Sequence, residues 1–268
     1  MPRISQINKF PEEEKIAIYS LLIPPSLFSR IETRSGVSRY DDGRFVFVRL
    51  CCPPGTMEMS LEVTLESEPD PLFLIELSDS KDYVQLQWDF INVNDPDSAR
   101  FATDVDPSGG SRWLNWAGRN IPEEVRALEA GLAPGQTRRG LKLMREINLG
   151  LDKFCRAVGL KSIALEALFY HTAVHFERHG YRYFKGHRMM SRIHELFQPG
   201  GKLYNKLDCS TPFRRPEFAN TVRGRSWAIH DYVLDEINDP IVDMWEPPLM
   251  YRMVGERHVT ETFPGACY

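Results

Sequence analysis

The sequence predicts an α+β protein with a mainly antiparallel sheet flanked by helices and a helical C-terminal extension. Three observations support this prediction. Short apolar segments separated by turns fill residues 43–93, a helix–strand–helix–strand pattern covers residues 134–186, and helical periodicity continues after Gly186. Successive strands with short turns indicate an antiparallel meander, and the later alternation of helix and strand indicates a βαβ-like unit.

Domain organisation follows from the same three stretches. We expect an N-terminal helical segment over residues 1–42, a core over residues 43–186, and a helical or irregular extension over residues 187–268 that packs on the core. The chain has 268 residues, of which 42% are hydrophobic and 26% are charged. That is enough for one large domain or two small ones with a real hydrophobic core.

Composition and charge argue against several classes of protein. The formal net charge is −4, so no global basic field is present to attract nucleic acid. The chain has no apolar run approaching about 18 residues, and its first residues contain no apolar signal-peptide core, so we expect no membrane span and a cytoplasmic location. The five cysteines have no CxxC spacing, which favours reduced thiols over a disulfide framework or a zinc knuckle.

The N-terminal segment carries the signals of a helix start. Pro11 precedes the stretch EEEKIAIYSLLI, whose three glutamates suit the positive end of a helix dipole. Pro24 and Pro25 end this helix, and a second short helix is expected over SLFSRIE.

Four strands are expected in the first half of the core. They are short, rich in β-branched and aromatic residues, and separated by turns that contain proline, glycine or aspartate. In the second and fourth, apolar side chains alternate with polar ones and therefore share one face of the sheet. The four stretches are RFVFVRL (44–50), MSLEVTLE (59–66), PLFLIEL (71–77) and YVQLQWDFINV (83–93).

Residues 94–135 are turn-rich apart from one helix, expected over EEVRALEAGL. Asn120 suits the cap of this helix, and two glutamates occupy its first turn. We interpret Trp113 and Trp116 as buried anchors of this excursion, with the lining of a pocket as the alternative.

The stretch from Pro134 to Gly186 is the most informative part of the chain. Apolar residues recur at steps of three and four over residues 138–158, which predicts an amphipathic helix ended by Gly159. A strand (KSIALEAL), a helix (FYHTAVHFERHGY) and another strand (YRYFKG) are expected to follow. Beyond them, helices are expected over HRMMSRIHELF and GRSWAIHDYVLDEIND, and the last residues have no regular pattern.

A turn rich in glycine and arginine precedes the predicted amphipathic helix. It runs from Gly135 to Gly140 and contains Arg138 and Arg139. Backbone N–H groups and the dipole at a helix start favour an anion such as a phosphate, and glycines permit its close approach. The arginines would add charge-assisted hydrogen bonds. The alternative is an ordinary turn.

A second motif lies downstream of this turn. It reads Phe176-Glu177-Arg178-His179-Gly180-Tyr181 and follows one helix, one strand and one short helix. Together with the antiparallel strands and the Gly/Arg turn, this order resembles the GNAT family of acyl-CoA N-acyltransferases over about residues 57–186. In that family a loop of the form Q/R-x-x-G-x-G/A opens a helix, and a later motif combines an aromatic, an acidic and a basic residue before Gly-Phe or Gly-Tyr.

The resemblance implies a fold, a reaction and a set of ligands. The sheet would be mixed and splayed between its fourth and fifth strands, where the pantetheine arm of an acyl-CoA enters. The donor would be acetyl-CoA or a longer acyl-CoA, or an acyl-carrier protein, and a small-molecule amine would attack the thioester directly. A homodimer is possible within this reading. The donor's pyrophosphate would contact Gln136, Thr137, Arg138, Arg139, Gly140 and Leu141.

Two departures from the family pattern concern the site itself. With Gly140 as the last motif glycine, Gly135 occupies the first motif position and Arg138 the middle glycine. The position of the family's tyrosine, which often protonates the leaving thiolate, holds Phe176, a side chain that cannot transfer a proton. Roughly 40 residues also separate the fourth predicted strand from the turn, so an insertion or a missed strand is expected there.

Proton transfer therefore requires other residues. Tyr170 and His171 lie at a strand–helix junction, near the place where the resemblance would put the donor sulfur. Glu166 faces away from the apolar side of its strand and is a candidate base acting through water. The amine must lose a proton and the thiolate can accept one, so a side chain that titrates near neutrality could serve in either proton transfer. An ordinary structural role is the alternative for each.

Two other functions remain open. The chain could keep the fold as a non-catalytic binding protein. It could also bind a metal through His171, His175 and His179, which share one helix face, with His187 or His194 as a further ligand. The acyltransferase reading requires no metal. A local group of arginines, formed by Arg214, Arg215, Arg223 and Arg225, suits either phosphates or a solvated loop.

Overall fold

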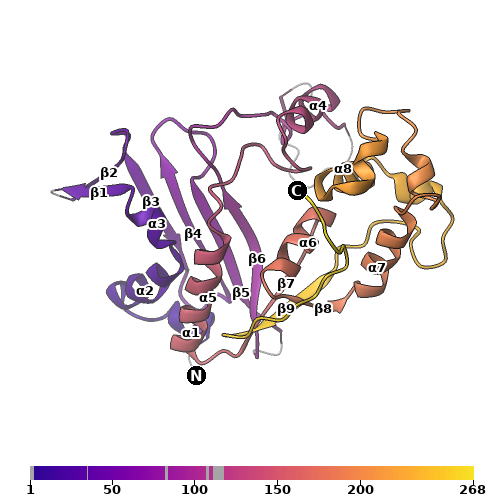
Figure 1. Cartoon of the computed structure of the whole chain (residues 1–268). Helices are drawn as coiled ribbons and strands as arrows, with labels where there is room; N and C mark the ends of the chain where they lie inside the picture. Colours follow the sequence, from indigo (N-terminus) through magenta and orange to yellow (C-terminus); the bar gives the residue numbers. More distant parts are fainter. Residues whose placement is uncertain (1–2, 35, 82–83, 107–108, 111–117) are drawn as a thin grey trace. The chain divides into compact units, whose positions relative to one another are not determined.

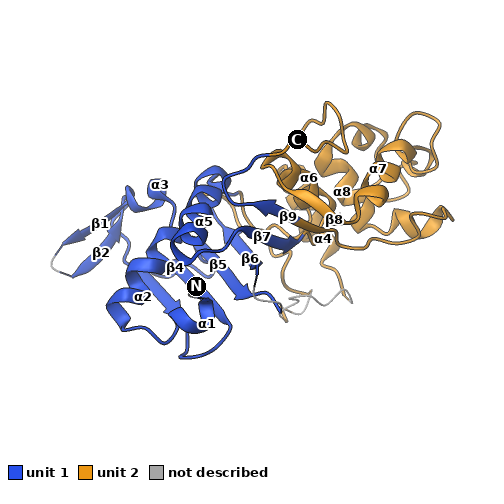
Figure 2. Ribbon diagram, turned by 90° about the horizontal axis from the view of Figure 1, so that it is seen from below, with its two compact units in different colours: residues 1–97, 140–166, 251–257 blue, residues 98–139, 167–250, 258–268 orange. Residues whose placement is uncertain are grey.

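The structure is a computed structural model that describes residues 3–34, 36–81, 84–106, 109–110 and 118–268 (Figure 1). Trp113 and Trp116 lie outside these residues. The chain forms two compact units (Figure 2). Unit 1 comprises Met1–Asp97, Gly140–Glu166 and Tyr251–Arg257, and unit 2 comprises Ser98–Arg139, Ala167–Met250 and His258–Tyr268.

Unit 1 is built on a mixed, mainly antiparallel sheet. Strands β3 (Val46–Cys51), β4 (Glu58–Leu65), β5 (Phe73–Asp79) and β6 (Leu86–Val93) form an antiparallel meander. The next strand, β7 (Ser162–Glu166), pairs with β6 in parallel. These elements confirm an α+β fold with a mixed, mainly antiparallel sheet, and they confirm the four predicted strands.

Strand β9 (Leu249–Met253) follows β7 in the strand order, although the sequence predicted irregular structure there. The strand has only five residues and directly follows Pro247 and Pro248. An alternation of apolar and polar residues over so short a stretch gives no clear sequence signal. Leu249 and Met250 belong to unit 2, as does strand β8 (Arg182–Lys185), the next neighbour in the order.

Alternation along the strands creates the core of unit 1. Four side chains of β4 and three of β5 are buried on one face: Met59, Leu61, Val63, Leu65, Phe73, Ile75 and Leu77. Helices α1 (Ile4–Ile7), α2 (Glu12–Tyr19) and α5 (Met144–Val158) lie over this face (Figure 1). The pattern that the sequence showed in the second strand is therefore the pattern of burial.

Short elements complete the N-terminal part of unit 1. The chain continues from α2 into a 3₁₀ turn, η1 (Ser20–Leu22), and helix α3 (Pro25–Phe28). An antiparallel hairpin of β1 (Ile31–Arg34) and β2 (Val37–Tyr40) follows; the sequence analysis predicted neither α1 nor this hairpin. Asp79 at the end of β5 holds α1, because its two carboxylate oxygens accept hydrogen bonds from the N–H groups of Ile4 and Ser5, each at 3.0 Å.

Helix α5 starts six residues later than the periodicity predicted. Its cap is Leu143, and Gly159 ends it with φ 76°. On the buried face of α5, Asp152 forms an ion pair with Arg252 of β9, whose Nη1 lies 2.9 Å from a carboxylate oxygen of Asp152. This buried ion pair joins helix and strand within unit 1.

Unit 2 is mainly helical. Its helices are α4 (Ile121–Glu129), α6 (Tyr170–Arg178), α7 (His187–Leu196) and α8 (Val222–His230), with short 3₁₀ turns η2 (Tyr204–Lys206), η3 (Pro216–Asn220) and η4 (Val233–Glu236). Trp227 of α8 centres one core cluster: its ring stacks on Phe213 at 5.1 Å, and its Nε1 donates to the carbonyl of Leu132 at 2.8 Å.

The arginine group predicted near residue 220 is not a single basic surface. Arg214 forms ion pairs with Asp231 and Glu236. Arg225 is buried, with its guanidinium 3.5 Å from the ring centre of Phe263. Carboxylates from another segment of unit 2 therefore neutralise Arg214, and an aromatic ring from a third segment packs against Arg225. The arginines form one cluster in the sequence only.

Among the residues that the structure describes, no helix has the length and apolar composition needed to cross a membrane.

Candidate functional site

The end of the β6–β7 ladder is the best candidate site in unit 1. The parallel pairing covers only three residue pairs and stops at Trp88–Leu165. Strand β6 then continues to Val93, while β7 ends one residue later at Glu166. Within the described residues, the pairs between β6 and β7 therefore end at Trp88 and Leu165, and beyond them the carbonyl of Phe90 accepts a hydrogen bond from Nε1 of Trp88 at 3.1 Å.

A β-bulge lies at the same point. The register between β5 and β6 shifts at Glu76/Leu77, so that Asp89 has no partner of its own on β5. An inserted residue bends its strand and increases the local twist, and bulges often occur beside functional sites. The bulge thus coincides with the place where β6 and β7 stop pairing, and we call this place the ladder end.

Three carboxylate residues occupy strand positions next to the ladder end. Asp89 and Glu166 are each the first residue after the last β6–β7 pair, and Glu76 is next to the bulge on β5. Burial raises the pKa of Asp89, and the carboxylate of Glu58 raises it further, against a hydrogen bond from Ser78. The pKa of Glu76 is also raised, first by burial and then by Asp89. Both groups are therefore better proton acceptors than ordinary carboxylates.

The segment that leads into α5 approaches the far end of β6. A side chain at Gly140 would place its Cβ 3.2 Å from the carbonyl oxygen of Val93, so glycine permits this close approach. Lys142 has φ 60°, an unusual conformation for a residue with a side chain. The cap residue Leu143 makes no side-chain hydrogen bond to the start of α5. The first turn of α5 also contains Glu146, whose carboxylate accepts hydrogen bonds from the backbone N–H and the hydroxyl of Ser26.

The predicted pyrophosphate loop is divided between the units. Gln136, Thr137, Arg138 and Arg139 belong to unit 2, whereas Gly140 and Leu141 belong to unit 1. Donors of the unit 2 part bind their own unit: the N–H of Gln136 donates to Ala133, and that of Arg139 to the hydroxyl of Ser98.

Both loop arginines also bind backbone carbonyls of unit 2. Arg138 is buried and donates to the carbonyl of Ser98 at 3.0 Å, and Arg139 donates to that of Ala130 at 3.2 Å. Gly135, with φ 77°, lies where a Cβ would come within 2.8 Å of the ring of Phe169. Each of these residues therefore has a packing role in the fold.

Of the predicted catalytic residues, Tyr170 is completely enclosed in unit 2. Its hydroxyl lies 3.4 Å from Nη1 of Arg225, and its ring packs edge-on against Trp245. Burial raises the pKa of Tyr170 to about 12, with Arg225 acting in the opposite direction. The hydroxyl therefore stays protonated at neutral pH.

His171 is also buried in unit 2. Its Nδ1 lies 2.9 Å from the hydroxyl of Ser226 on α8. Burial lowers the pKa of His171 to about 3, helped by the nearby His175, Arg223 and His230. The imidazole is therefore neutral over the physiological range, and its observed contact joins α6 to α8.

Glu166, the third predicted catalytic residue, lies in unit 1 at the ladder end, where its side chain is exposed. The sequence analysis named it but missed Asp89 and Glu76. Both occupy polar positions of alternating strands, and no local sequence signal marks the bulge between them. Phe176, the aromatic residue of the second sequence motif, is buried and packs edge-on against Tyr181 at 5.2 Å.

The three histidines predicted to share one helix face have different contacts in the structure. His171 turns to Ser226, whereas the rings of His175 and His179 lie 4.7 Å apart. Across the described ranges, no group of three His, Cys, Asp or Glu side chains has an arrangement suited to a metal ion.

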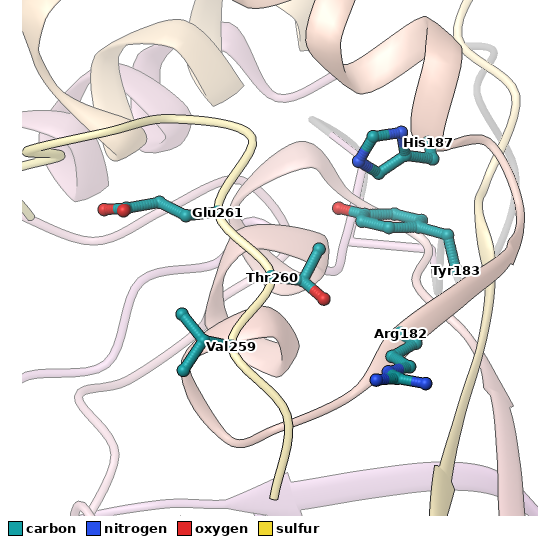
Figure 3. Close-up of a pocket in the computed structure, with 6 residues that line it drawn as sticks. All are labelled: Arg182, Tyr183, His187, Val259, Thr260 and Glu261. Atoms are coloured by element: carbon teal, nitrogen blue, oxygen red, sulfur yellow. The ribbon is translucent and has the colours of Figure 1, made fainter.

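Unit 2 contains a surface cavity of about 430 Å³, lined by Arg182, Tyr183, His187, Val259, Thr260 and Glu261 (Figure 3). The hydroxyl of Tyr183 donates to the buried carboxylate of Glu177 at 2.6 Å, and the hydroxyl of Thr262 donates to the same carboxylate at 2.7 Å. The motif glutamate thus connects β8 to the C-terminal segment. Its pKa is raised, mainly by burial.

No family model, curated protein or solved structure matches this chain.

Proposed function

We propose that the protein is an acyltransferase that moves an acyl group from an acyl-CoA-type thioester to an amine at the ladder end. The single observation that carries the proposal is the three-pair β6–β7 ladder, beyond which β6 continues to Val93. An extended ligand can add to a strand by main-chain hydrogen bonds where no neighbouring strand lies. The pantetheine arm of a CoA thioester is such a ligand, because it is an extended chain with two amide groups.

The start of α5 suits the phosphates of the same donor. Lys142 and the N-terminal N–H groups of a fifteen-residue helix provide positive charge and hydrogen-bond donors. Gly140 lets this segment approach the end of β6. The sequence analysis expected the phosphates at residues 136–141. We now propose that residues 140–145 bind them, all of which belong to unit 1.

The carboxylates suit the acceptor. An amine arrives as an ammonium ion, which an acidic site attracts, and must lose a proton before it attacks. The amine nitrogen bonds to the thioester carbonyl carbon, the C–S bond breaks, and the sulfur leaves as a thiolate. Asp89 takes the proton that the ammonium ion loses before attack, directly or through water, with Glu166 and Glu76 as the alternatives. The second nitrogen proton goes to the leaving thiolate.

Donor binding is the first test. Isothermal titration and thermal unfolding of the full chain with CoA, acetyl-CoA and longer acyl-CoAs should show saturable binding, and Lys142→Ala should weaken it. A matched Lys161→Ala variant, in the same unit but outside the proposed site, should bind as the wild type does. If no CoA ester binds below about 1 mM, the proposal fails.

Transfer is the second test, measured as thiol release with a panel of amines. Asp89→Asn should lower kcat/KM by about 10²–10⁴-fold without weakening donor binding, because it removes a general base. Glu66→Gln, an exposed carboxylate at the end of β4, is the control. The raised pKa of Asp89 predicts that wild-type kcat/KM falls on acidification at a higher pH than an ordinary aspartate would give. Donor binding without thiol release for any amine would favour the non-catalytic reading.

A further inference from the structure

The cavity of unit 2 lies between two segments that are far apart in the sequence. Arg182 and Tyr183 of β8 and His187 at the start of α7 line one wall, and residues 259–261 of the C-terminal segment line the other (Figure 3). Its volume of about 430 Å³ is in the range of sites that hold small molecules. All six residues belong to unit 2, whereas the ladder end belongs to unit 1, so the cavity is a candidate site separate from that of the proposed function.

A buried carboxylate holds the two walls together. The hydroxyl of Tyr183 donates to Oε1 of Glu177 at 2.6 Å. Thr262 donates to both oxygens of the same carboxylate, from its hydroxyl at 2.7 Å and from its backbone N–H at 3.1 Å. Glu177 is only 3% exposed, so these hydrogen bonds are shielded from water. The fold itself therefore fixes the spacing of the walls.

The wall formed by β8 and α7 carries positive charge. Arg182 is permanently charged, and its Nη2 is hydrogen-bonded to Nδ1 of His258, which fixes the guanidinium at the cavity. His187 and Arg188 are the first two residues of α7, and both are exposed. Basic groups close together attract an anion to this wall.

The opposite wall does not cancel this charge. Its acidic residue, Glu261, accepts a hydrogen bond from the backbone N–H of Gly265 at 3.3 Å. Figure 3 shows its carboxylate pointing away from the other labelled side chains. The same view shows Thr260 turned towards the wall that carries Arg182, so this threonine brings a hydroxyl donor to the cavity.

The start of α7 adds backbone donors. The helix has ten residues, and its cap is Gly186, which has no side chain to accept hydrogen bonds from the first turn. The first helical bond runs from the N–H of Met190 to the carbonyl of Gly186. Among the described residues, no backbone carbonyl accepts from the N–H groups of His187, Arg188 or Met189. Such N–H groups, together with the helix dipole, favour a bound oxyanion.

We propose that the cavity binds the phosphate group of a small organic phosphate. The guanidinium of Arg182, the imidazole of His187, the hydroxyl of Thr260 and the N–H groups of α7 offer donors from more than two directions. A tetrahedral phosphate has three terminal oxygens for them, whereas a planar carboxylate has two. The cavity is larger than a phosphate ion alone, and the organic part contacts the ring of Tyr183 and the exposed Val259.

Nuclear magnetic resonance of the full chain tests this proposal, with phenyl phosphate as the probe. Titration should shift the backbone amide resonances of residues 186–189 saturably, with a Kd below about 1 mM. These resonances report on the unit 2 cavity, so a phosphate bound at the start of α5 does not confuse the measurement. Lys142→Ala should leave this titration unchanged, which separates it from the test of the proposed donor site.

Two variants remove donors from the cavity. Arg182→Ala should weaken phenyl phosphate binding by about tenfold or more, because it removes a charge-assisted contact. Thr260→Val keeps the shape of the side chain and should weaken binding about two- to tenfold, because one neutral hydrogen bond is lost. Lys185→Ala is the matched control. Lys185 is another exposed cation of β8, but it pairs with Glu246 at 2.9 Å and does not line the cavity, so its removal should leave the Kd unchanged.

Benzoate distinguishes phosphate from carboxylate, because it presents the same ring with a planar anionic group. It should bind at least about tenfold more weakly than phenyl phosphate. Four outcomes overturn the proposal: no saturable shift at residues 186–189, an unchanged Kd in both Arg182→Ala and Thr260→Val, equal weakening by Lys185→Ala and Arg182→Ala, or benzoate binding as tight as that of phenyl phosphate. A preference for phenyl phosphate that depends on Arg182 but not on Lys185 supports it.

Discussion

Burial sets the protonation state of two histidines in unit 2. His171 has its Nδ1 on the hydroxyl of Ser226 and a pKa lowered to about 3, and the pKa of His175 is lowered to about 4. Burial is the first cause for both, followed by neighbouring positive groups. The neutral imidazoles are thus part of the folded structure, whereas an unfolded chain protonates them near pH 6.5.

This difference predicts acid sensitivity. A group whose pKa is lower in the folded state contributes stability that is complete above the unfolded pKa and is lost as the pH falls towards the folded value. The free energy of unfolding should therefore fall from about pH 6.5 down to about pH 3, the lower of the two folded pKa values. His171→Gln should cost about 1 kcal/mol at pH 8, where it alters one hydrogen bond, but should lose less stability on acidification.

Urea unfolding of both proteins at pH 8, 6 and 5 measures the two slopes. A His171→Gln variant whose stability declines as steeply as that of the wild type would show that His171 contributes nothing to the acid response. His171→Gln/His175→Gln should flatten the decline further.

At the scale of elements, α5 shows where packing overrides local preference. Gly150 lies in the middle of this helix, a position where glycine normally weakens a helix by about 1 kcal/mol relative to alanine. A Cβ at Gly150 would lie 2.7 Å from the carbonyl oxygen of Leu21 in η1. The backbone of η1 therefore approaches the helix more closely than any side chain permits.

We expect Gly150→Ala to destabilise the protein in spite of its better helix propensity, by a net amount of about 1–3 kcal/mol, because one of the two backbones must move. Leu149→Ala, at the neighbouring exposed position, is the control and should change stability by less than about 0.5 kcal/mol. Chemical denaturation followed by circular dichroism measures both. Equal or greater stability of Gly150→Ala would contradict the close contact.

At the scale of the whole molecule, the chain crosses repeatedly between its units. Each unit takes three separate segments of the chain, whereas the predicted division had a core over residues 43–186 and an extension over residues 187–268. Residues 251–257 return to unit 1, where Arg252 pairs with the buried Asp152. Helix α8 packs with α6 inside unit 2 through Ser226 and His171.

This interleaving predicts that a fragment of residues 1–186 does not fold. It would lose β9, leave the Asp152 carboxylate without its arginine, and remove α7 and α8 from unit 2. We expect an insoluble product, or a soluble one with a collapsed two-dimensional NMR spectrum, while the full chain gives dispersed resonances. A dispersed spectrum from the fragment would contradict this expectation and would support the predicted division into core and extension.

The sequence by itself determined the features that depend on neighbours in the chain. Alternation in residues 59–66 and 83–93 identified β4 and β6, periodicity identified most of α5, and Gly159 identified its end. These signals are local, because burial on one face repeats with the period of the element.

Only the tertiary structure decided which residues meet. The bulge at Asp89, the short β6–β7 ladder and the position of Glu166 beside it arise from pairing between distant strands, which no local pattern encodes. The same holds for Arg138 and Arg225: the sequence shows their charge, but burial and partners are set by segments far along the chain. The sequence gives the chemical identity of each side chain, whereas the fold determines which groups surround it.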